Sequence, residues 1–145
     1  MSSFDIFRRL ESTDDNQEAL RQEVKTYKAA GAIVAGDFVE LDASKTGATR
    51  ALYVKECTAL GTLGNSALVG VALEAATAAG DDIRIVTHGY VVANVHADTE
   101  TGKLLCGPIT VAGRADLALA STYGPVAVAL ENDTANLAAI WLFAR

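Results

Sequence analysis

The sequence has few aromatic residues and no long apolar run. Only 6% of its 145 residues are aromatic, so alanine, valine, leucine and glycine must form the core. Such small side chains suit closely spaced strands better than a roomy ligand cavity. No apolar run approaches the roughly 18 residues that a membrane-spanning helix needs. Since the N-terminus, MSSFDIFRRLESTDD, also lacks the apolar region of a secretory signal, we expect a soluble protein made in a cytoplasm, with no membrane partner.

Basic residues and cysteines are scarce too. The net charge is -6, and Arg8 and Arg9 are the only adjacent basic pair. Nucleic-acid binding needs a concentrated basic face, so we expect no nucleic-acid partner. The two cysteines, Cys57 and Cys106, are widely spaced and form no C-x-x-C pair. We expect them to be reduced and buried rather than to bind zinc or to form a disulfide.

Catalytic motifs are missing as well. The sequence has no G-x-S-x-G, H-E-x-x-H, Walker or G-x-G-x-x-G motif. Its two histidines, His88 and His96, have Asp98 as the nearest carboxylate, and surface histidines near a hairpin explain them better than a metal site. Asp81 and Asp82 follow a glycine in AAGDD, which is typical of a hairpin turn rather than of acid–base catalysis. We expect no enzymatic activity, no cofactor and no metal.

The first 28 residues differ from the rest, because they are rich in charge and poor in core-type residues. The i, i+4 spacing of Leu20 and Val24 predicts a short helix over residues 14–28. We interpret residues 1–28 as an arm that orders against a neighbouring subunit or another protein, and residues 29–145 as the folded domain. A frayed terminal tail is the alternative. The candidate capsid or subunit contacts in the arm are Phe4, Ile6, Phe7, Arg8 and Arg9.

From residue 29 onward the sequence has the pattern of short strands separated by glycine, aspartate and asparagine. About eight to ten strands at regular intervals are typical of an antiparallel barrel or sandwich. Pro108 and Pro125 each follow a glycine at the expected start of a strand. Residues 56–66, ECTALGTLGNS, are expected to form a loop or a single helical turn. The expected strand segments are AIVAGDFVELDA, TRALYVKE, ALVGVALEA, DDIRIVTHGYVVANVHA, GPITVAG, ADLALA, GPVAVALEN and AAIWLFA.

One phrase occurs twice. Val-x-Val-Ala-Leu-Glu begins at Val69 and again at Val126, and the match continues without a gap into a second strand. A weaker similarity precedes each phrase and aligns Gly36 with Gly107. Valine, alanine and leucine are common here, so a chance match is the alternative. A duplication predicts two similar halves that together close one sheet. The glutamates ending the two phrases are then equivalent strand ends, not an acid–base pair.

Three stretches carry a family resemblance: AAGAIVAGDFVELD, LVGVALEAATAAGDDIRIVTHGYVVANV and the second GPVAVALEN. They resemble the small capsid decoration (cement, or head-stabilising) proteins of tailed bacteriophages, closely over residues 29–95 and loosely elsewhere. The long charged arm and the ECTALGTLGNS insertion depart from the family pattern. The matching positions are Gly36, Asp37, the run from Val69 to Glu74, Gly80, Asp81, Ile83, Ile85 and Gly89.

The resemblance implies a trimer on the capsid shell, with an arm along capsid or neighbouring subunits. We therefore expect an all-β protein, a small antiparallel β-barrel or β-tulip-like domain of two similar halves with an extended N-terminal arm. It would bind the major capsid protein and itself, as a homotrimer, on the virion surface and stabilise the head. The alternatives are a tail, neck or fibre-base adaptor and a small carbohydrate- or peptide-binding module. Such a module usually exposes an aromatic platform, whereas Trp141 lies in the apolar AAIWLFA and is expected in the core or an interface.

Overall fold

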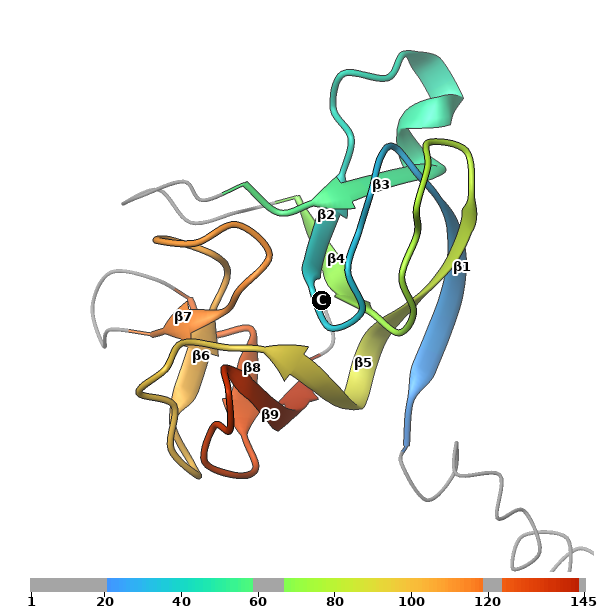
Figure 1. Cartoon of the computed structure of the whole chain (residues 1–145). Coiled ribbons are helices and arrows are strands. Elements are labelled where there is room, and N and C mark those ends of the chain that lie inside the picture. The colour runs from blue at the N-terminus through green and yellow to red at the C-terminus, as the bar shows by residue number, and fades with distance from the viewer. Residues whose placement is uncertain (1–20, 59–66, 119–123, 144–145) are drawn as a thin grey trace, which may run out of the picture.

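The chain folds almost entirely into β-strands. The computed structural model describes residues 21–58, 67–118 and 124–143, and these ranges contain one short 3-10 helix, η1 (Gly47–Ala51), and no α-helix. The all-β prediction is confirmed. None of the described segments forms a helix with the length and apolarity needed to cross a bilayer. The strands are β1 (Glu23–Ala29), β2 (Phe38–Leu41), β3 (Tyr53–Glu56), β4 (Leu68–Ala72), β5 (Asp82–Asn94), β6 (Leu104–Cys106), β7 (Asp116–Leu117), β8 (Ala127–Ala129) and β9 (Leu137–Leu142) (Figure 1).

The first five strands close into a barrel in the order β1, β3, β2, β4, β5. The ring closes because β1 pairs with both β3 and β5. Small aliphatic side chains fill it, among them Val39, Val54, Ile83 and Ile85, which are fully buried. The pair β1–β3 is parallel, whereas the other barrel pairs are antiparallel. The predicted barrel is therefore confirmed, with one parallel pair.

Strand β1 occupies part of a predicted helix. The helix expected over residues 14–28 is wrong for Glu23–Ala29, which is extended. Leu20 and Val24 would give a helix only a narrow stripe to bury, whereas strand pairing with β5 and β3 satisfies the backbone groups on both edges. The predicted boundary at residue 28 falls inside this strand. Residues 1–20 lie outside the described residues, so the division into an arm and a barrel domain stays a prediction.

Strands β6 to β9 form a second unit beside the barrel. They extend the sheet from the far half of β5 in the order β9, β8, β6, β7, and Figure 1 shows β5 passing from the barrel into this unit. Gly89 lies within this strand, where its φ is +100°. A β-carbon at Gly89 would lie 1.9 Å from the carbonyl oxygen of Arg21. Only glycine therefore lets the two backbones pass this closely.

The two halves share one strand order. Outward from the β5–β9 pair, β5-β4-β2-β3 corresponds to β9-β8-β6-β7. Both predicted hairpins form, with Val71 opposite Val86 and Val128 opposite Trp141. These partners are 15 residues apart in the first hairpin and 13 in the second. Val86 therefore corresponds to Trp141, whereas the ungapped alignment had matched it to Phe143.

The weaker similarity aligns at a different glycine. The N–H of Gly36 donates to the carbonyl of Ala72 at 2.8 Å, and the N–H of Gly102 donates to that of Ala129 at 2.8 Å. Gly36 therefore corresponds to Gly102, and the match to Gly107 is wrong. The prediction that the two halves together close one sheet is wrong as well, because β1 closes the barrel within the first half. Among the described residues the second half has no equivalent of β1, and its sheet ends at β7.

One predicted strand is a loop. GPITVAG, residues 107–113, connects β6 to β7 without strand structure. The carboxylate of Asp116 holds it, because the N–H groups of Ile109 and Thr110 donate to one of its oxygens at 2.7 and 2.9 Å. Pro108 therefore follows β6 instead of starting a strand, whereas Pro125 precedes β8 as expected. In ECTALGTLGNS, residues 59–66 lie outside the described residues.

Candidate functional site

A line of apolar side chains crosses the second unit. Tyr90 on β5 lies opposite Trp141 on β9, Trp141 lies opposite Val128 on β8, and Val128 lies opposite Leu104 on β6. Directly paired residues point to the same face of a sheet, so these four side chains share one face. Leu104 is 47% exposed and the other three are half-buried.

A second line runs beside it. Val92 lies opposite Ala139, and Leu130 donates its N–H to the carbonyl of Ala139 at 2.9 Å. Leu137 lies opposite Asn94, two residues along β5 from Val92 and therefore on the same face. Of the seven large hydrophobic residues exposed among the described residues, four gather here, so this is a patch rather than scatter. We call the following residues, none of them charged, the outer face: Tyr90, Val92, Leu104, Val128, Leu130, Leu137, Ala139 and Trp141.

Strand alternation sends the intervening residues into the core. Val91, Ala93, Leu105, Ile140 and Leu142 are at most 2% exposed and belong to the core cluster that the second unit shares with the barrel. Both faces of this sheet are thus apolar, which is typical of strands covered on both sides. The described residues cover only one of them. Contiguous exposed apolar patches mark interaction sites, so the outer face is our candidate interaction surface.

A groove continues the outer face toward the barrel. It has a volume of about 360 Å³. Gln22, just before β1, lines it and donates a side-chain hydrogen bond to the carbonyl of Tyr90 at 2.8 Å. The start of the described chain is therefore fixed at the border of the outer face. The other lining residues are Ala35, Gly36, Ala72, Leu73, Tyr90, Val91, Val92 and Leu137.

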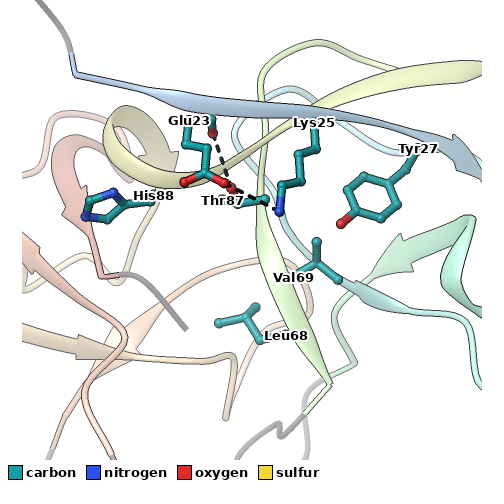
Figure 2. Close-up of a pocket in the computed structure, with 7 residues that line it drawn as sticks. All are labelled: Glu23, Lys25, Tyr27, Leu68, Val69, Thr87 and His88. Carbon is teal, nitrogen blue, oxygen red and sulfur yellow. Dashed lines mark hydrogen bonds and ion pairs between the residues drawn. The ribbon is translucent and has the colours of Figure 1, made fainter.

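A second, more polar groove of about 240 Å³ lies between β1, β4 and β5. Figure 2 shows its lining, with Glu23, Lys25 and Tyr27 from β1 facing Leu68 and Val69 from β4. Lys25 forms an exposed ion pair with Glu23 at 3.4 Å. Thr87 donates its hydroxyl to the carbonyl of Glu23 at 3.3 Å. The ion pair lies within β1, whereas the hydrogen bond from Thr87 joins β1 to β5.

The two histidines make separate structural contacts. His88 meets the ring of Trp141 edge to face, with centroids 5.6 Å apart, at the margin of the outer face. The Nδ1 atom of His96 accepts the N–H of Asp98 at 3.1 Å in a turn. Within the described ranges, no group of three His, Cys, Asp or Glu residues is placed to hold a metal ion.

The carboxylates singled out in the sequence serve turns. Asp81 accepts the N–H groups of Thr77 and Ala78 at 3.2 and 3.0 Å, and these bonds hold its pKa below the usual range. The predicted turn role is confirmed. Glu74 accepts the N–H of Arg84 at 3.1 Å and Glu131 that of Ala139 at 2.8 Å, so both brace the facing strand of their hairpin. Hydrogen bonds from Arg84 lower the pKa of Glu74.

Both cysteines are buried and reduced, as predicted. Burial raises the pKa of the Cys106 thiol to about 11, and the nearby Asp116 adds to this effect. The thiol is therefore protonated near neutral pH and a poor nucleophile.

The predicted contact residues Phe4, Ile6, Phe7, Arg8 and Arg9 lie outside the described residues. Sequence reasoning missed the outer face as a surface. The available signal was the alternation in the Tyr90 and Trp141 strands, but it does not reveal which apolar face lacks a cover.

Comparisons identify the fold rather than a family. The sequence matches no known family profile and no curated protein. The structure is similar to the head fiber gp8.5 N base of bacteriophage phi29, with a TM-score of 0.56 and 14% identity over 84% of this chain and 94% of that one. It is also similar to a chain of the capsid of Myoviridae phage XM1, with a TM-score of 0.57 and 15% identity over 83% and 82% of the two chains. At such identities the likeness establishes a shared fold.

Proposed function

We propose that this chain is a non-enzymatic structural protein of a phage virion, and that it binds the outer surface of the head and stabilises it. The observation that carries the proposal is the fold shared with a head fiber base and with a chain of a phage capsid. The resemblance of residues 29–95 to decoration proteins supports the finer assignment. Synthesis in the host cytoplasm, followed by addition to the head, completes the proposal.

Decoration requires complementary surfaces rather than a pocket. The outer face supplies an apolar surface, and Phe4, Ile6, Phe7, Arg8 and Arg9 are the proposed arm contacts. The partners are the major capsid protein and further copies of this chain in a homotrimer. Several weak contacts made together bind far more firmly than each alone.

Particles with and without the protein test the stabilising role. Heads that carry it should survive heating and chelator treatment that empties or breaks heads that lack it, and electron microscopy should locate it on the outer surface. Equal survival of both particle types would contradict stabilisation. Density on the tail or neck would contradict the location.

Trimerisation is tested separately by sedimentation equilibrium. A homotrimer should give three times the mass of one chain across a concentration series. A mass of one chain at all concentrations contradicts a trimer formed before attachment.

The phi29 likeness favours one second candidate, the base of a fibre attached to the head. A base would be found at the foot of a projecting fibre and would co-purify with a longer fibre protein. A decoration protein would coat heads that carry no fibre. Labelled particles therefore separate the two.

A further inference from the structure

We propose that the outer face of the free protein is covered by the chain's own N-terminal segment, with Phe4, Ile6, Phe7 and Leu10 as the apolar contacts. The inference concerns the isolated chain. It therefore stands or falls independently of where the protein binds on a particle.

The point at which the described chain begins supports this occupant. Gln22 lines the groove beside the outer face, and its side chain donates to the carbonyl of Tyr90 at 2.8 Å. The backbone of Arg21 passes so close to Gly89 that a β-carbon there would lie 1.9 Å from its oxygen. The chain therefore enters β1 directly at the border of the outer face, with 20 residues before it.

The segment is long enough to reach across. From Tyr90 to Leu104 the outer face spans three strand spacings, or about 14 Å. The ten residues between Leu10 and Arg21 extend to about 35 Å when fully stretched. Residues 4–10 can therefore lie anywhere on the outer face while slack remains in the connection.

The chemistry of the two surfaces matches. The outer face carries no charged side chain. Residues 4–10 hold four of the five large apolar side chains of residues 2–20, together with the charged Asp5, Arg8 and Arg9. In the first half of the chain, the corresponding apolar line is covered by another part of the protein. There, the corresponding residues Phe38, Val71 and Val86 are fully buried beneath the second unit.

Trp141 gives a direct test, because it is the single tryptophan of the chain and lies on the outer face. We expect full-length F4S/I6S/F7S to show red-shifted emission and a severalfold larger acrylamide quenching constant than the parent chain. The matched control R8S/R9S/E11S changes three polar residues of the same segment and should leave both values unchanged. Far-UV circular dichroism verifies that each variant keeps the β fold.

Three results would overturn the proposal. Unchanged quenching in F4S/I6S/F7S means that something else covers Trp141 or that it is uncovered. An equal effect of R8S/R9S/E11S means that the apolar side chains are not the contact. Protection that disappears on dilution means that a second copy, rather than the same chain, supplies the cover. As a second variant, V92S on the outer face should also raise quenching, since it weakens the contact from the other side.

Discussion

The two halves of this molecule use one strand order in two environments. In the first half, Phe38, Val71 and Val86 form a line across β2, β4 and β5 and are fully buried. In the second half, Leu104, Val128 and Trp141 form the corresponding line and are exposed or half-buried.

The difference shows that burial depends on what is stacked on a sheet, not on the sheet itself. The second unit packs its inner face onto the outside of the barrel and buries one line. The described residues leave the other line exposed or half-buried. Packing of the two halves thus buries the apolar line of the first half and leaves the corresponding apolar line of the second half at the surface. An exposed apolar patch of this kind is expected of an interaction face.

The largest contrast should come from matched truncations of the two lines. Phe38→Ala should lower the free energy of unfolding by about 3–5 kcal/mol, since it leaves a cavity in the core. Leu104→Ala, at the corresponding exposed position, should change it by about 0.5 kcal/mol in the F4S/I6S/F7S background, where the N-terminal segment no longer covers the outer face. Urea unfolding followed by circular dichroism measures both. Equal losses in that background would contradict the comparison, because they would mean that something other than the N-terminal segment buries the outer line.

The next largest difference in stability is expected between alanine substitutions at two glycines, one in each half. Gly89 and Gly102 both have positive φ, but a β-carbon at Gly89 meets the Arg21 backbone whereas one at Gly102 meets open space. Gly89→Ala should destabilise by about 3 kcal/mol, because it adds a steric clash to the strained φ. Gly102→Ala should cost about 1 kcal/mol from the φ alone. Thermal unfolding distinguishes them, and similar melting temperatures would show that β1 does not need the close passage.

Replacing the two glutamates that brace the hairpins should lower the free energy of unfolding by modestly different amounts. Glu131→Ala leaves the N–H of Ala139, which is 6% exposed, without its partner and should cost about 1–2 kcal/mol. Glu74→Ala frees the N–H of the exposed Arg84, which water can satisfy, so its effect should be smaller. Native-state hydrogen exchange at Ala139 and Arg84 reports each contact directly. A larger loss of unfolding free energy in Glu74→Ala than in Glu131→Ala would reverse this ranking.

The smallest effect concerns pH. Burial, with the Asp37 carboxylate nearby, raises the pKa of Glu56 above its ordinary value of 4.5. The stability that Glu56 contributes is present below that value and lost as pH rises through its folded pKa. Glu56→Gln removes this loss, so the variant should gain stability relative to the parent as pH rises. Glu74→Gln should show the opposite slope, because the pKa of Glu74 is lowered. Parallel slopes in urea titrations at several pH values would contradict both assignments.

Much of the fold could be predicted from local pattern, and little of the site could. The doubled Val-x-Val-Ala-Leu-Glu phrase predicted both hairpins, and AAGDD predicted the turn that Asp81 caps. The predicted helix is wrong for residues 23–28 because the spacing of Leu20 and Val24 carries no information about the open barrel that β1 closes. GPITVAG failed because Asp116, downstream in sequence, binds its backbone.

The sequence by itself determined strand alternation, turn positions and the absence of catalytic motifs, because these depend on neighbouring residues. Only the tertiary structure decided that β1 closes the first half, that Val86 corresponds to Trp141, and that one of two equivalent apolar faces is left partly exposed by the described residues. Those outcomes depend on which segments meet across the fold. The two similar halves pack against each other through non-equivalent faces, so corresponding side chains are buried in the first half and exposed or half-buried in the second.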